Sequence, residues 1–95
     1  MKVLWSPLAI ADRERVFDFI GQRSPRAAVS TDERIAAAVR RLGYFPEFGR
    51  AGRVAGTREL AVEGAQLIVA YRCDADSVTV LRVLHTSRRW PDAFV

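Results

Sequence analysis

The stretch LIVAYRC, residues 67–73, decides the fold class of this chain. Its first five residues are apolar without interruption, which is typical of a strand that is buried on both faces. Such a strand belongs in the centre of a sheet that is covered by helices. Turn residues bound the stretch, with Glu63-Gly64 before it and 74–77 after it. These short turns predict neighbouring strands at 57–62 and 78–85 in an antiparallel meander.

Two helices are predicted upstream of this meander, and each opens with the same Ser-Pro signal. Serine is a good N-cap and proline is favoured in the first helical turn. Ser6-Pro7 and Ser24-Pro25 therefore predict helix starts. The first helix would end near Gly21, and the second would cover 25–42 and stop at Gly43, because glycine commonly terminates helices.

The order of the predicted elements indicates an α+β fold. Ser30 and Glu33 have capping-box spacing and offer a competing start, but we favour one long second helix. Two helices with a short connection form an antiparallel hairpin, and residues 2–5 read as an edge strand. We expect a single domain over 1–95, an N-terminal helical hairpin packed on a small antiparallel sheet in the order β-α-α-β-β-β.

Residues 43–56 are predicted to be a glycine-rich loop with basic edges. Arg50 and Arg53 alternate there with glycines. The two arginines could cradle a phosphate backbone, whereas the glycines could simply permit a turn. Both interpretations stay open at the level of the sequence.

The charge balance is basic. The chain has 95 residues with Lys+Arg 15 against Asp+Glu 11, a formal net charge of +4 and a pI near 10.2. Lys2 is the only lysine, so nearly all of the positive charge is arginine, whose planar fork binds phosphates and carboxylates with two hydrogen bonds. A basic surface implies an acidic partner, which could be nucleic acid, a ribosome or an acidic protein segment.

Several classes of protein are excluded by what the sequence lacks. Cys73 is the only cysteine, so an intrachain disulfide or a cysteine metal cluster cannot form. No apolar run approaches the ~20 residues of a membrane span, and the start of the chain does not resemble a secretory signal. We expect a cytoplasmic protein that works without a membrane, a metal or a cofactor.

An ordered set of short motifs is similar to the RelE/ParE superfamily, the toxins of bacterial type II toxin–antitoxin modules. The motifs are SPLA (6–9), SPRAA (24–28), RRL (40–42), FPEFGR (45–50), GTREL (56–60), VAYR (69–72), VLRVLH (80–85) and RRWP (88–91). The resemblance implies a small toxin that a cognate antitoxin holds inactive in a hetero-oligomer. The C-terminal segment of such an antitoxin wraps the toxin across its helical hairpin and sheet.

The resemblance leaves the cellular target open. RelE-like members cleave mRNA in the ribosomal A site without a metal, and ParE-like members act on DNA gyrase. For a nuclease, the catalytic candidates are Arg58, His85 and Arg88, because histidine exchanges protons near neutral pH and arginine stabilises a phosphorane. The lysine pair and the C-terminal tyrosine of RelE itself are absent. We therefore favour ParE-like inhibition of DNA gyrase, with a ribosome-dependent mRNA endonuclease as the alternative.

Arginines and one tryptophan are the candidate contacts with an antitoxin or a target. The set comprises Arg50, Arg53, Arg58, Arg88, Arg89 and Trp90. Strict alternation places His85 on one strand face with Leu81 and Val83, and Arg82 on the other face with Val80 and Leu84. Arg82 would then be partly buried, and we expect Glu59 of a neighbouring strand to pair with it.

Overall fold

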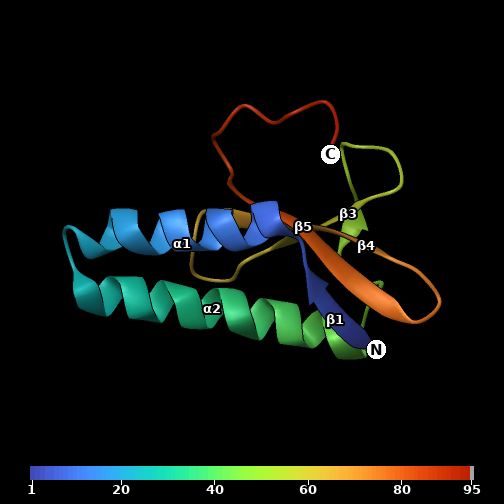
Figure 1. Ribbon diagram of the computed structural model, residues 1–95, viewed down its shortest axis with the longest axis horizontal. Coiled ribbons are helices and arrows are strands. Elements are labelled where there is room, and N and C mark those ends of the chain that lie inside the picture. The colour runs from blue at the N-terminus through green and yellow to red at the C-terminus, as the bar shows by residue number, and fades with distance from the viewer. Residues whose placement is uncertain (95) are drawn as a thin grey trace.

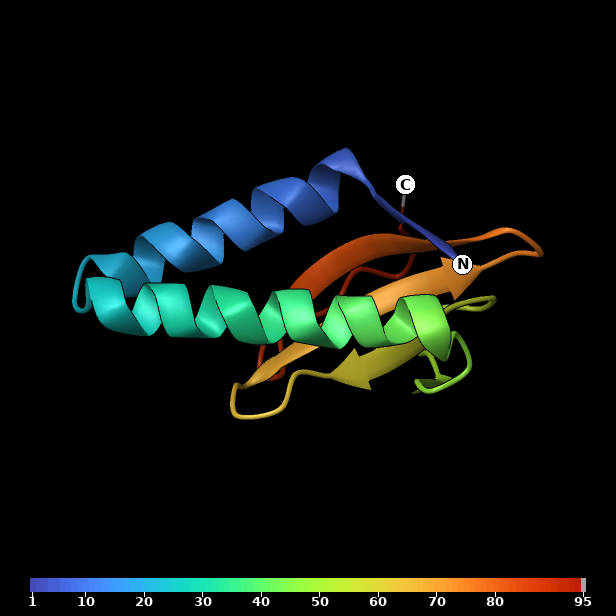
Figure 2. The ribbon, with the colours of Figure 1, turned by 90° about the horizontal axis from the view of Figure 1, so that it is seen from below.

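A computed structural model describes residues 1–94, which form a five-stranded sheet with two helices on one face (Figures 1 and 2). In chain order the elements are β1 (Lys2–Trp5), α1 (Pro7–Gly21), α2 (Pro25–Tyr44), β2 (Arg50–Ala51), β3 (Arg58–Ala61), β4 (Leu67–Cys73) and β5 (Ser77–His85). The spatial order is β1-β5-β4-β3-β2, so β4 is the central strand, as its apolar run predicts. The predicted α+β architecture is confirmed.

The sheet differs from the prediction in two respects. Arg50 and Ala51, expected in a loop, pair with Glu59 and Arg58 as a short edge strand, so four strands follow the helices instead of three. β1 pairs with β5 in parallel, which makes the sheet mixed, whereas β3, β4 and β5 form the predicted antiparallel meander. The β1–β5 pairing joins residues 75 positions apart, such as Lys2 and Ser77, which no local pattern encodes, whereas β2 and β3 pair as a short hairpin within the glycine-rich segment.

The helix starts follow the Ser-Pro signals. The Ser6 hydroxyl accepts a hydrogen bond from the Ala9 amide at 3.1 Å, and Ser24 caps α2 in the same way. The start at Ser24 is therefore confirmed over the competing start at Ser30. The predicted stop at Gly43 is wrong, because α2 continues to Tyr44. The N-terminal ammonium donates to the Gly43 carbonyl at 2.8 Å and satisfies one of the free carbonyls of the last turn.

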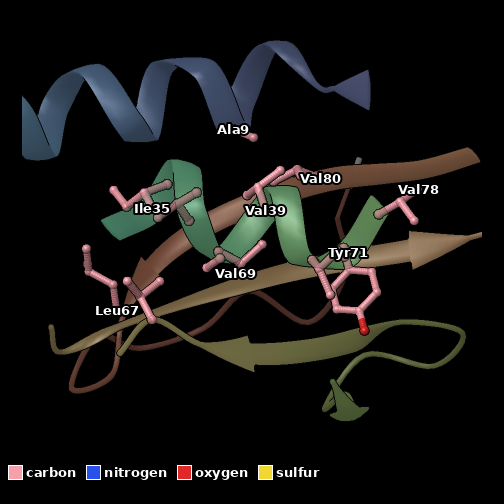
Figure 3. Packing of buried hydrophobic residues seen from close by; sticks show 12 residues of the cluster. Ala9, Ile35, Val39, Leu67, Val69, Tyr71, Val78 and Val80 are labelled. Atoms are coloured by element: carbon pink, nitrogen blue, oxygen red, sulfur yellow. The ribbon is translucent and has the colours of Figure 1, made fainter. Parts of the chain in front are cut away.

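The core lies between the helices and the helix-facing side of the sheet (Figure 3). Ile35, Val39 and Leu42 of α2 are fully or almost fully buried against Val69 and Tyr71 of β4. Three residues of β5 belong to the same cluster, namely Val78, Val80 and Val83. None of the helices in the described residues is both long and apolar enough to cross a membrane.

A β-bulge in β5 overturns the predicted strand faces. Tyr71 lies opposite Val80 and Ala70 lies opposite Arg82, so Leu81 is an extra residue without a partner. Beyond the bulge the alternation is shifted by one residue. Val80 consequently lies on the core face with Val83, instead of sharing the face of Arg82.

Arg82 pairs with Asp12 of α1, and the predicted pairing with Glu59 is wrong. Its Nε and Nη2 atoms donate to the two Asp12 carboxylate oxygens at 2.7 and 2.9 Å. The Val83 amide adds a third hydrogen bond to Asp12 at 2.9 Å. The Asp12 hydrogen bond holds the pKa of Arg82 above its ordinary value. This bidentate ion pair connects α1 with β5 next to the bulge.

Another ion pair joins the two helices. The Arg13 guanidinium donates to both oxygens of Asp32 at 2.6 and 2.9 Å, and it lies 5.0 Å from the centre of the Trp5 ring. The hydrogen bond from Arg13 lowers the pKa of the Asp32 carboxyl. A carboxyl with a lowered pKa in the folded state stabilises the fold above its unfolded pKa, and this contribution disappears as the pH falls through the folded pKa.

Replacing Asp32 with asparagine is expected to lower the free energy of unfolding by up to about 1 kcal/mol at pH 7, since both side chains are partly exposed. The difference from the unmodified chain should begin to shrink as the pH falls below about 4, the ordinary pKa of an aspartate, and should disappear as the pH passes the lowered pKa of Asp32 in the folded chain. Urea denaturation at a series of pH values measures it. A difference that stays constant from pH 7 to pH 3 would contradict this origin of the stabilisation.

Candidate functional site

An open hollow of about 460 Å³ lies between α1 and the ends of β4 and β5. Its walls are mainly apolar side chains, namely Val16, Phe19, Ile20, Ala65, Leu67 and Val83. Polar groups form the rim, with Arg15, Thr31, Gln66, His85 and Arg88 around the apolar floor. We call this feature the α1 hollow. An apolar floor with a few polar groups at its edge is the usual composition of a binding site.

The α1 helix carries more apolar surface than its own fold covers. It buries Ala9 and Asp12 against the sheet, yet Phe19 beside the hollow is 68% exposed. Ile10 and Phe17 are exposed on the other flank. A helix that is apolar around most of its circumference is normally buried on all sides. The exposed flanks of α1 therefore indicate a surface for a macromolecular partner.

The rim of the hollow is positively charged. Asp12 is the only carboxylate among the described lining residues, and Arg82 neutralises it with a bidentate pair. Arg15 also contacts Asp12 at 3.3 Å, but its side chain is largely exposed. Arg88 makes no ion pair within residues 1–94, and it lines the hollow beside His85. An anionic group at this rim would meet arginine donors.

His85 presents a donor at the rim. The Ser87 amide donates to its Nδ1 atom at 3.1 Å. Because Nδ1 accepts this hydrogen bond, the proton of the neutral ring lies on Nε2. His85 is exposed at the end of β5 and is therefore accessible to a partner. In this tautomer the ring can donate to a carboxylate or a phosphate oxygen.

The three catalytic candidates do not form one cluster. His85 and Arg88 both line the α1 hollow. Arg58 of β3 lies opposite Tyr71 on β4, and His85 lies opposite Leu67 on the same strand. These two positions are four residues apart, or roughly 13 Å along an extended strand. The structure thus brings two of the candidates together and places Arg58 at the other end of the sheet.

Arg58 contacts the loop before β2. Its Nη1 atom donates to the Gly49 carbonyl at 2.8 Å and, at 3.4 Å, to the Glu47 carbonyl. The Arg58 guanidinium is therefore already hydrogen-bonded to main-chain carbonyl groups. Arg58 makes no ion pair with any residue that the structure describes, and the neighbouring Glu59 pairs with Arg50 and Arg53 instead.

Arg50 and Arg53 surround the buried carboxylate of Glu59. Its Oε1 atom lies 3.4 Å from Arg50 Nη2 and 3.6 Å from Arg53 Nε, and its Oε2 atom accepts the Arg53 amide hydrogen at 2.8 Å. The Arg53 guanidinium also lies over the Trp90 ring, 3.9 Å from its centre. The Trp90 ring in turn packs on Phe94 at 6.2 Å. The contact between Arg53 and Trp90 joins the C-terminal tail to the loop before β3, and Figure 1 shows the tail near this loop. Arg89 is exposed in the same tail.

The α1 residues that build the hollow are not among the candidates that the sequence predicts. Asp12, Arg15, Val16, Phe19 and Ile20 come from a helix that periodicity assigns to the core. The available signal was the wide spread of apolar residues around α1, which exceeds the single stripe that one sheet can cover.

The fold and the α1 hollow define a class of protein, a small α+β domain whose exposed helix is suited to binding a macromolecule. A family model described as the ParE toxin of the type II toxin–antitoxin system parDE matches residues 3–90. The chain therefore belongs to the ParE toxin family, within the RelE/ParE superfamily that its motifs resemble.

Individual relatives agree with this assignment. The chain is 33% identical over 90 residues to "Putative toxin Y4kP" of Sinorhizobium fredii, which covers 95% of this chain and 93% of that protein. It is 37% identical over 87 residues to "Toxin RelE2" of Caulobacter vibrioides, covering 92% and 97% of the two chains. A solved structure of the chromosomal ParDE system from P. aeruginosa superposes with a TM-score of 0.80 at 24% identity, covering 90% of this chain and 95% of that one. This last similarity concerns the fold.

Proposed function

We propose that a cognate antitoxin neutralises this toxin by laying an amphipathic segment along α1, with apolar side chains in the α1 hollow. The observation that carries the proposal is the apolar floor beneath a rim of arginine and histidine donors. Carboxylates of the antitoxin segment would pair with Arg15, His85 and Arg88. The shape and charge of the hollow both suit an acidic amphipathic helix.

Phe19→Ser is expected to weaken antitoxin binding about 30-fold or more, because Phe19 is a large exposed anchor at the hollow. Isothermal titration calorimetry with the antitoxin encoded beside the toxin gene measures the effect. Val29→Ser removes an apolar side chain of α2 that is exposed but lies outside the lining of the hollow. This control should bind normally. Equal affinities of the two variants would exclude the α1 hollow as the antitoxin seat.

We further propose that the free toxin inhibits DNA gyrase. Membership of the ParE family supports this target, and so does the absence of the lysine pair and the C-terminal tyrosine expected of a RelE-like nuclease. Purified toxin should be incubated with DNA gyrase and, separately, with translating ribosomes. We expect loss of supercoiling and intact mRNA. Cuts in A-site codons with normal supercoiling would overturn this assignment.

A ribosome-dependent mRNA endonuclease is the second candidate. It is favoured by one observation, the proximity of His85 and Arg88 at the rim of the α1 hollow. In that case Arg88 would stabilise the charged phosphorane and His85 would transfer a proton. Arg88→Ala would then abolish mRNA cleavage. Toxicity that survives both Arg88→Ala and His85→Ala would exclude the enzymatic mechanism.

A further inference from the structure

A second exposed apolar feature lies at the end of α2, away from the α1 hollow. Residues 44–48, YFPEF, comprise the last residue of α2 and the first four residues of the loop before β2, and we call them the aromatic loop. Tyr44 is 81% exposed, Phe45 62% and Phe48 56%. Together with Pro46 and Glu47 they line an open hollow of about 380 Å³. The lining residues of this hollow and of the α1 hollow do not overlap.

The base of the aromatic loop is rigidly held from the core. The buried Tyr71 hydroxyl donates to the Pro46 carbonyl and accepts the Gly49 amide hydrogen, both at 2.8 Å. Figure 3 shows that the Tyr71 ring lies in the core cluster and that its hydroxyl points away from the other side chains of the cluster. Burial raises the pKa of Tyr71, so its hydroxyl keeps the proton that it donates. Arg58 adds the hydrogen bond to the Gly49 carbonyl.

The three aromatic rings are exposed although the loop that carries them is fixed. Tyr44, Phe45 and Phe48 are not part of the core cluster, so the packing of residues 1–94 does not explain why aromatic residues occupy these positions. Aromatic side chains with a neighbouring arginine are typical of a binding hot spot. A preorganised loop also loses less conformational entropy when it binds.

The charge around the aromatic loop is predominantly positive. The Arg41 guanidinium lies 5.5 Å from the Phe48 ring centre, and the N-terminal ammonium lies on the Gly43 carbonyl. Arg58 lies beneath the loop. Glu47 is the only acidic residue of the aromatic loop, and it has no ion pair with any residue that the structure describes. This excess of cations is complementary to an acidic surface.

We propose that the aromatic loop is the surface with which the free toxin binds its cellular target, and that the target presents an acidic protein surface with an apolar anchor. The anchor would enter the hollow between Tyr44, Phe45 and Phe48. A protein is favoured over a single-stranded nucleic acid because Arg41 already lies over one face of Phe48 and the acidic residue Glu47 is part of the lining of the hollow. This inference rests on the proposed function and assigns the antitoxin and the target to different surfaces.

The test compares Phe45→Glu with Phe45→Arg and with the control Val29→Ser. Phe45 and Val29 are both exposed, so all three variants should fold, and circular dichroism checks this. We expect antitoxin affinity within about twofold of the unmodified toxin. Growth arrest on induction and inhibition of gyrase supercoiling should weaken at least tenfold for Phe45→Glu and less for Phe45→Arg, because an acidic partner repels the glutamate.

Each outcome distinguishes the inference from the proposed function. If the unmodified toxin arrests growth without inhibiting gyrase, the target assignment fails, and growth arrest by the variants still tests the aromatic loop. Unchanged toxicity of Phe45→Glu, or a greater loss for Phe45→Arg, would overturn the inference. Loss of antitoxin affinity would assign the loop to the antitoxin instead. Binding of a labelled dT20 oligonucleotide that only Phe45→Glu abolishes would identify a nucleic-acid surface and refute a protein target.

Discussion

Replacing Asp12 with alanine is expected to lower the free energy of unfolding by about 3–5 kcal/mol, the largest effect that we predict for this chain. The Asp12 side chain is 2% exposed and accepts hydrogen bonds from Arg82 and from the Val83 amide. Its removal would leave the mostly buried Arg82 guanidinium without a counter-ion and the amide without an acceptor. Both groups would remain desolvated in the folded chain without the hydrogen bonds that offset the cost of their desolvation.

Urea denaturation followed by circular dichroism measures this effect. A small domain is stable by only about 5–15 kcal/mol, so Asp12→Ala would unfold at a much lower urea concentration. The matched control is Arg15→Ala, which removes the other arginine near Asp12. Arg15 has a 64% exposed side chain, and its loss should change the stability by less than about 1 kcal/mol. Similar stabilities of Asp12→Ala and Arg15→Ala would refute the role of the buried pair.

Replacing Gly49 with alanine is expected to lower the free energy of unfolding by about 2–3 kcal/mol. A Cβ atom at this position would lie 2.6 Å from the Tyr71 hydroxyl oxygen and 2.8 Å from the Glu59 carbonyl oxygen. Neither neighbour can yield cheaply, because one is a buried ring and the other is the backbone of β3. Relief of the clash would break the hydrogen bonds of Tyr71 with Pro46 and Gly49.

Thermal denaturation of Gly49→Ala should show a Tm lower by about 10 °C or more, since each 1 kcal/mol corresponds to about 4–8 °C in a domain of this size. Gly21→Ala is the matched control. The nearest atom to its added Cβ is 3.8 Å away, at the end of α1, so its Tm should be unchanged or slightly raised. A Tm of Gly49→Ala equal to that of Gly21→Ala would show that the base of the aromatic loop can adapt.

The helix starts, the strands of the meander and the family were predictable because their signals are local. Ser6 and Ser24 bond to amides three residues away, and the apolar run of β4 depends only on neighbouring residues. The motifs that resemble the RelE/ParE superfamily are also short and contiguous. Each of these features depends on an interaction, or on a pattern, that spans a few residues of chain.

The site depended on long-range contacts and was only partly predictable. His85 and Arg88 lie three residues apart, so their association at the rim follows from the chain itself. The separation of Arg58 from them follows from the strand register. The partner of Arg82 lies 70 residues away in the sequence, and the bulge at Leu81 reverses the face that simple alternation predicts.

The α+β class, the limits of most elements, the basic charge and the toxin family could all be predicted from the amino-acid sequence. These properties follow from composition and from interactions between near neighbours. Three further features depend on how the chain packs in three dimensions: Asp12 binds Arg82, β1 runs parallel to β5, and the α1 hollow and the aromatic loop remain exposed. Exposure is a property of the assembled chain, because a side chain becomes buried or free only when segments distant in sequence have packed together.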